Sequence, residues 1–219
     1  MKTNTLFIAA FALALSFSAC QNNASKTETD HSSIDSNDMD MDSMSMSSGM
    51  KSGMDKMMTD MHQMEMTGNV DNDFAMMMKS HHQGAVDMAQ AELESGKDEE
   101  LKKMAQKIID AQKSEINELQ SFLDNHKNPE KNYDPAKKDE EFSKVMDQNM
   151  TMMMDMPEMD QSSSTDKHFV QMMIPHHESA VKMAEGFIQF GKDPGLIAMG
   201  KKIIQDQKME IEQFKKWTE

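Results

Sequence analysis

The chain repeats itself after 95 residues, and this internal repeat constrains the fold more than any other feature of the sequence. A gapless shift places His81-His82 on His176-His177 and Gly96-Lys97-Asp98 on Gly191-Lys192-Asp193. The same shift aligns further identical residues along the unit, among them Phe74 with Phe169, Ala85-Val86 with Ala180-Val181, Lys107-Ile108-Ile109 with Lys202-Ile203-Ile204 and Gln112-Lys113 with Gln207-Lys208. The chain therefore contains one structural unit twice.

The sequence of each unit predicts a short Met-rich segment followed by two helices. In the first unit the helices are expected over 73–95 and 98–124, because Gly96 supplies a stop and Asp98 an N-cap. Gly191 and Asp193 repeat these signals, and Pro194 suits the first position of a helix. A buried face is predicted for the second helix of each unit from residues at three- and four-residue spacing: Leu101, Met104, Ile108, Gln112, Ile116 and Leu119, with Leu196, Met199, Ile203, Ile211 and Phe214 as counterparts.

Two helical hairpins with matching apolar faces most simply pack as a four-helix bundle, so the expected fold class is all-α. Short Met-rich segments near 54–66 and 140–156 are expected to add extra helices. The predicted organisation is a signal peptide (1–19), a disordered tether (20–53), a first helical repeat (54–124), a connector with an extra helix (125–149) and a second helical repeat (150–219).

The N-terminus, MKTNTLFIAAFALALSFSAC, has the layout of an export signal. Its apolar run from Leu6 to Phe17 follows Lys2 and is too short to cross a bilayer comfortably. The ending Phe17-Ser18-Ala19-Cys20 resembles the bacterial lipoprotein signal, in which the cysteine is lipidated. We therefore expect an exported envelope protein, with a lipid anchor at Cys20 on the periplasmic or outer side of a bacterial membrane. Ordinary cleavage and release is the alternative.

Composition narrows the possible partners. The net charge of −15 argues against nucleic acid and favours cations. Methionine occurs 29 times, more often than an ordinary core requires. The tract DMDMDSMSMSSGMKSGM places methionines among Asp, Ser and Gly in the segment expected to be disordered, where they cannot serve as core residues. This tract is either a linker or a low-affinity binding segment for soft metal ions.

Methionines also flank the His-His pair along the first helix of each unit. At about 100° per residue, Met77, His81 and Met88 share an arc of roughly 40°, and Met78 lies one turn from His82. Met88 is almost two turns beyond His81, so a site containing both needs a ligand from another helix. The candidate metal ligands are Met77, Met78, His81, His82 and Met88, and their counterparts Met172, Met173, His176, His177 and Met183.

These ligand types favour copper(I), with silver(I) as a mimic. Thioether sulfur is a soft donor that selects copper(I) over zinc or calcium, and imidazole adds a stronger nitrogen ligand. Cys20 is the only cysteine, so the chain forms no internal disulfide, and an acylated Cys20 leaves no thiolate for metal binding. Isolated methionines are common core residues, but a duplicated His-His pair with methionines one turn away is harder to explain by packing.

The stretches FAMMMKSHHQGAVDMA and FVQMMIPHHESAVKMA resemble the signature of the bacterial DUF305 family, domain of unknown function 305. The resemblance covers about residues 55–124 and 150–217. It implies a ferritin-like all-helical fold and copper handling, because some exported members bind copper and are associated with copper tolerance. Lys79-Ser80 and Glu178-Ser179 depart from the usual motif, so the two sites are expected to differ or only one to function.

The resulting hypothesis is an exported copper(I)-binding protein that buffers the ion or passes it to an envelope protein that exports or receives copper. A metal-free lipoprotein that binds envelope partners through Met-rich surfaces is the alternative. A metal-dependent oxidase is a weaker one, since neither His pair has the Glu three residues upstream that di-iron bundles use. We therefore expect no enzymatic activity.

Overall fold

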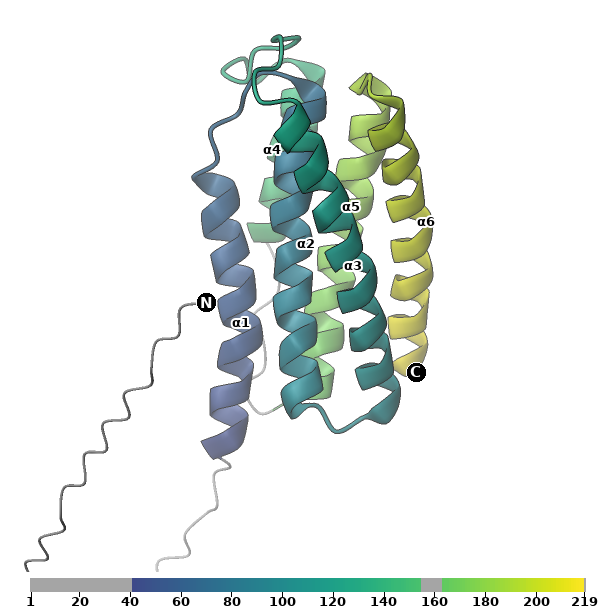
Figure 1. Ribbon diagram of the computed structural model, residues 1–219. Helices are drawn as coiled ribbons and strands as arrows, with labels where there is room; N and C mark the ends of the chain where they lie inside the picture. The colour runs from purple at the N-terminus through teal and green to yellow at the C-terminus, as the bar shows by residue number, and fades with distance from the viewer. Residues whose placement is uncertain (1–40, 155–162, 219) are drawn as a thin grey trace, which may run out of the picture. The chain divides into compact units, whose positions relative to one another are not determined.

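The computed structural model describes residues 41–154 and 163–218, which all belong to the compact unit Asp38–Glu219 (Figure 1). The expected signal peptide, the lipidation site at Cys20 and the tether up to residue 40 lie outside the described residues. All regular structure within 41–154 and 163–218 is helical, and the all-α prediction is confirmed. The helices are α1 (Met41–His62), α2 (Val70–Ser95), α3 (Glu99–Asn125), α4 (Glu141–Met154), α5 (Thr165–Phe190) and α6 (Pro194–Trp217).

The two predicted hairpins are α2–α3 and α5–α6. In the first, α2 begins three residues before the expected start and α3 ends one residue after the expected end. The predicted caps are present: the Asp98 carboxylate accepts the backbone N–H groups of Glu100 and Leu101, and Asp193 accepts that of Leu196. In the second hairpin, α5 continues through Pro175 without interruption.

Helix α1 corrects the prediction of disorder up to residue 53. It begins at Met41 and is 22 residues long, so the end of the Met-rich tract is helical and α1 is no short accessory segment. The composition of this stretch is polar on average, but Met50, Met54, Met57 and Met61 share one face and are buried in the core. Packing of that face against the bundle stabilises a helix that its sequence alone would not.

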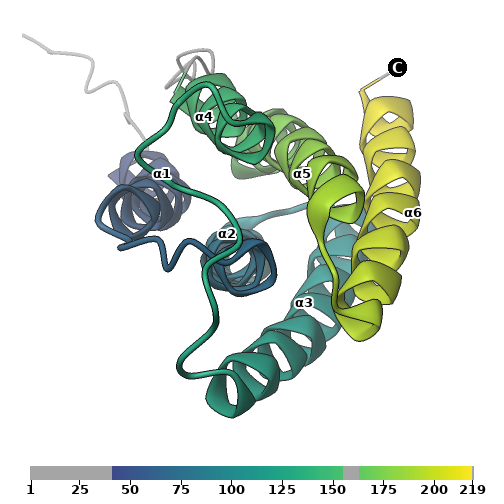
Figure 2. The same ribbon diagram turned by 90° about the horizontal axis from the view of Figure 1, so that it is seen from above.

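Helices α2 and α5 lie antiparallel at the centre of the unit, with α3 and α6 on one side and α1 and α4 on the other (Figure 2). The contacts between the repeats are reciprocal. Asp71 at the start of α2 accepts the backbone N–H groups of Lys192 and Asp193 in the α5–α6 turn. Asp166 at the start of α5 accepts those of Lys97 and Asp98 in the α2–α3 turn. The reciprocal contacts thus relate the duplicated units by an approximate twofold axis that passes between α2 and α5.

Small residues let the outer helices approach the central pair closely. A Cβ atom at Gly84 of α2 would collide with the side chain of Met57 in α1, and one at Gly186 of α5 would collide with Val145 in α4. Both contacts bring a flanking helix against the outward face of a central helix. None of the helices in the described ranges combines the length and the apolar character needed to cross a bilayer.

Candidate metal centre

The four repeated histidines meet at the middle of the central helix pair. His81 and His82 of α2 and His176 and His177 of α5 are all fully buried. The rings of His81 and His176 lie with centroids 3.8 Å apart and planes inclined by 39°, and the centroids of His176 and His177 are 6.0 Å apart. The sequence predicted one site in each repeat. The structure instead brings both pairs into a single cluster.

Three of the four rings have an oxygen atom within 3.1 Å of Nε2. His176 donates its Nε2–H to the backbone carbonyl of His81 at 3.1 Å, and His177 Nε2 is hydrogen-bonded to Glu210 Oε2 at 2.8 Å. His82 Nε2 lies 2.9 Å from Glu115 Oε2, an ion-pair distance without the alignment of a hydrogen bond. In each of these rings the partner at Nε2 leaves the Nδ1 atom free to serve another role.

Those remaining nitrogens have no partner among the described residues. Nδ1 of His82, His176 and His177 and both ring nitrogens of His81 are buried without a hydrogen bond. Buried polar atoms in folded proteins almost always have a partner, so a cluster of unpaired ones marks a functional site or a missing ligand. Metal-binding histidines characteristically hold one ring nitrogen on a carboxylate or carbonyl and offer the other to the ion. The unpaired ring nitrogens of the cluster are therefore candidate donors to a metal ion.

Glu115 of α3 and Glu210 of α6 are parts of this cluster that the sequence did not single out. Charged residues of a surface helix usually lie on its solvated face, but Glu115 is buried. Burial raises the pKa of the Glu115 carboxyl, yet its contacts with His82 and Lys202 outweigh burial and hold the pKa below its ordinary value. The signal was available, since the repeat places Glu115 on Glu210.

A buried glutamine accompanies each glutamate one turn earlier. Gln112 and Gln207, which the repeat also aligns, are each only 3% exposed. Neither side-chain atom of Gln112 has a partner within the described ranges, and Oε1 of Gln207 likewise has none. The faces of α3 and α6 that cover the histidines are therefore polar as well as apolar, which is unusual for a core maintained by packing alone.

The protonation state of the central rings follows from their burial. Burial, followed by the neighbouring histidines, holds the pKa of His81 and of His176 well below the ordinary value. Both imidazoles are accordingly neutral at neutral pH, and each has a lone pair on one ring nitrogen. A neutral imidazole is the form that binds a metal ion, so no proton needs to be displaced from these rings.

The candidate methionines are all buried, with exposed fractions of 0–4%: Met77, Met78, Met88, Met172, Met173 and Met183. Met77 lines a separate pocket between α1, α2 and α4. No three His, Asp or Glu side chains in 41–154 and 163–218 converge on a single point as metal ligands. The ligand role of these methionines stays a prediction.

The protein is a duplicated helical bundle with a candidate metal centre. Its two hairpins enclose the buried histidine cluster, and a carboxylate of each hairpin contacts one histidine. The chain belongs to the DUF305 family, described as a domain of unknown function, whose profile matches residues 17–123 and 71–218. The predicted family membership is confirmed. No protein of curated function matches the chain significantly.

Solved structures with a similar helical arrangement include those of CopM. The chain is 31% identical to CopM in its Cu(I)-bound form, with a TM-score of 0.50 over 67% of this chain and 94% of that one. The Cu(II)-bound form gives a TM-score of 0.51 and the silver-bound form, obtained by soaking, 0.50, both at 31% identity and 67% coverage of this chain. These matches cover 95% and 93% of the respective CopM chains.

Proposed function

We propose that the protein binds copper(I) through its buried histidine cluster and buffers the ion or passes it on. The observation that carries this proposal is the set of unpaired buried ring nitrogens, three of them on rings whose other nitrogen faces an oxygen partner. The copper- and silver-bound structures of CopM support the same metal chemistry.

Copper(I) fits the composition around the cluster better than harder ions do. Imidazole nitrogen binds several transition metals, but thioether sulfur selects copper(I). The residues closest in sequence to the His-His pairs that could add such a donor are the buried methionines of α2 and α5. Calcium and magnesium would require several oxygen ligands, whereas the carboxylates of Glu115 and Glu210 are engaged with histidines. Binding and release, rather than catalysis, is the proposed role.

The location follows from the sequence of the N-terminus. We propose that the chain is exported, anchored by a lipid at Cys20, and handles copper at the envelope surface. The methionines of the Met-rich tract that precede Met50 would add weak sites that capture the ion, while the cluster would hold it more tightly. An exported protein cannot depend on reduced cysteine in an oxidising compartment, and methionine with histidine provides an alternative ligand set.

The proposal is tested by an anaerobic copper(I) titration of residues 21–219 against a chromophoric competing chelator, with zinc(II) as the control ion. Tight, copper-selective uptake of at least one ion per chain is expected. Absence of competition would refute the proposal and leave the methionines as packing residues or as a surface for protein partners. Equal uptake of zinc would refute the assignment of copper(I).

A further inference from the structure

A second cluster of soft donors lies on the side of the bundle that carries α1 and α4. A pocket of about 340 Å³ opens between these helices, the loop that follows α1 and the outward face of α2. Six methionines line it: Met61, Met64, Met66, Met77, Met146 and Met150. His62 lines it too, and none of the four central histidines does.

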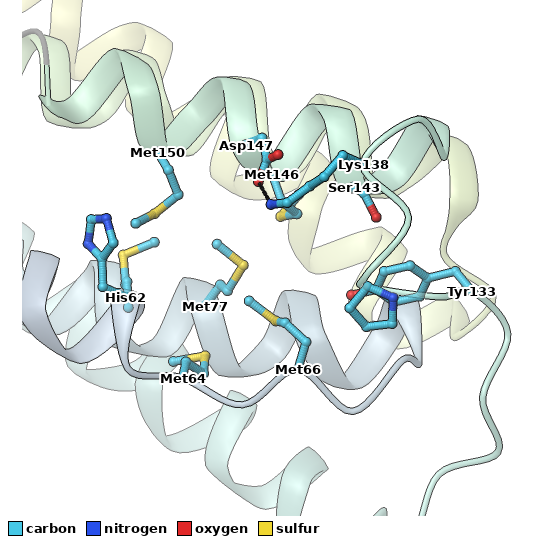
Figure 3. Close-up of a pocket in the computed structure, with 12 residues that line it drawn as sticks. His62, Met64, Met66, Met77, Tyr133, Lys138, Ser143, Met146, Asp147 and Met150 are labelled. Atoms are coloured by element: carbon cyan, nitrogen blue, oxygen red, sulfur yellow. Dashed lines mark hydrogen bonds and ion pairs between the residues drawn. The ribbon is translucent and has the colours of Figure 1, made fainter.

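The methionines surround space rather than fill it. In Figure 3 the side chains of Met66, Met77 and Met150 reach into the same opening, with His62 at one end. Core methionines normally serve to fill irregular gaps, and they have the flexibility to do so. Three of the six methionines, Met61, Met77 and Met146, also pack in the core. Gap filling does not account for the other three, which line the same open volume while only half-buried: Met64, Met66 and Met150.

One ring nitrogen of His62 is engaged by the backbone of α1. Its Nδ1 lies 2.9 Å from the backbone carbonyl oxygen of Met58, one turn earlier in α1, so Nδ1–H donates to that oxygen. This hydrogen bond fixes the tautomer and leaves the lone pair on Nε2. It is the same division of roles that the histidines of the central cluster show.

The oxygen atoms of the pocket are poorly suited to a hard cation. Its carboxylate, Asp147, is paired with Lys138 at 2.6 Å. No group of three His, Asp or Glu ligands forms within the described part of the chain. The donors that remain are thioether sulfurs, one imidazole nitrogen and the neutral hydroxyl of Ser143. Sulfur is the most abundant of these donors, and it prefers a soft monovalent ion.

We propose that this pocket is a separate soft-metal site, in which thioether sulfurs and His62 Nε2 bind copper(I) or silver(I). Unlike the buried histidine cluster, the site is reached from solvent, because His62 is exposed and Met64, Met66 and Met150 are half-buried. Its inner wall is Met77, one helical turn before His81, so the pocket lies next to the central cluster along α2. The inference takes the choice of metal from the proposed function but does not require that the central cluster binds it.

Silver(I) tests the site without redox chemistry. The full chain, labelled with ¹³C at its methionine methyl groups, is titrated with silver(I) and followed by NMR. The methyl signals of Met64, Met66, Met77 and Met150 are expected to shift together and saturate. The signal of Met209, an exposed methionine of α6, serves as an internal reference and should stay unchanged over the same range. Shifts confined to other methionines would overturn the proposal.

A variant separates this pocket from the central cluster. Met64→Leu, Met66→Leu, Met150→Leu and His62→Gln preserve side-chain size at partly exposed positions, so folding should be retained. This variant should bind one silver(I) fewer per chain than a control carrying Met209→Leu and His126→Gln, both outside the pocket. Equal stoichiometry and affinity in the two variants would refute the pocket site. If the central cluster bound no metal, the difference of one ion would still be expected.

Discussion

The imidazole rings of His81 and His176 face each other across the approximate twofold axis, with centroids 3.8 Å apart. Each ring comes from a different repeat, so duplication of the hairpin created one composite cluster instead of two independent sites. Glu115 and Glu210 complete the arrangement from α3 and α6, each beside the second histidine of a pair. A single unit would bury two histidines without the partner pair that faces them.

The carboxylates should position the histidines that they contact. We expect Glu115→Gln combined with Glu210→Gln to weaken copper(I) binding by about 10- to 100-fold, because the amide no longer orients and polarises the imidazole. The affinity is measured by anaerobic chelator competition. The matched control is Glu118→Gln, an exposed position on α3, which should leave the affinity unchanged. Unaltered binding in the double variant would show that the carboxylates have no role at the site.

The buried central rings predict a pH-dependent stability of the metal-free protein. The pKa values of His81 and His176 lie well below the ordinary value, because burial disfavours the charged ring. Below about pH 6.5 the unfolded chain therefore takes up protons that the folded chain does not, at a cost of about 1.4 kcal/mol per pH unit for each ring. The free energy of unfolding therefore decreases as the pH falls below about 6.5.

This effect is isolated by comparison with a variant. Urea unfolding of the wild type and of His81→Gln with His176→Gln is measured between pH 7.5 and pH 5. The free energy of unfolding of the wild type should fall relative to that of the variant as the pH decreases below 6.5. A constant difference across this range would mean that the two rings titrate normally in the folded protein.

Glu92 marks a place where the two repeats differ. Its counterpart, Phe187, stacks on Phe74 with ring centroids 3.8 Å apart, whereas the fully buried carboxylate of Glu92 has no hydrogen bond within the described residues. Burial, followed by the charge of Asp166, raises the pKa of Glu92 to about 8. Between the ordinary pKa of a glutamate and about pH 8, Glu92 is protonated in the folded chain but not in the unfolded chain. The free energy of unfolding therefore decreases as the pH rises towards 8.

Replacement of this carboxyl should stabilise the protein. We expect Glu92→Gln to raise the free energy of unfolding by about 2 kcal/mol at pH 7.5, and by much less at about pH 4, where the carboxyl is mostly protonated in both states. Glu94→Gln, an exposed position on the same helix, is the control and should have little effect at either pH. A destabilised Glu92→Gln protein at pH 7.5 would indicate that the carboxylate has a favourable partner.

The repeat was enough to predict the two hairpins, because the Gly96 and Gly191 stops and the following Asp caps are local signals. The full length of α1 was not predictable in this way. Its Ser, Asp and Gly content is typical of disorder, and its helix depends on the burial of Met50 and Met54 against the bundle. Such long-range packing leaves little trace in a short stretch of sequence.

The site was predictable only in part. Helical periodicity predicted which side of each helix carries histidine and methionine. It could not predict that α2 packs against α5, which brings the two His-His pairs into contact. Glu115 lies three residues after Gln112 and thus at the edge of the buried stripe, where charged residues usually reach solvent. Its role became visible once α3 was placed against His82. The pocket around His62 combines α1, α2 and α4, and no repeated spacing connects them.

The most direct test of the central claim is the copper(I) affinity of a variant that lacks all four histidines. His81→Ala, His82→Ala, His176→Ala and His177→Ala should remove the tightest copper(I) binding while the far-UV circular dichroism remains helical. The exposed His126→Ala is the matched control and should bind as the wild type does. Weaker binding through thioethers alone is expected to persist in the variant. Full copper(I) affinity in a folded protein without these four histidines would contradict the account.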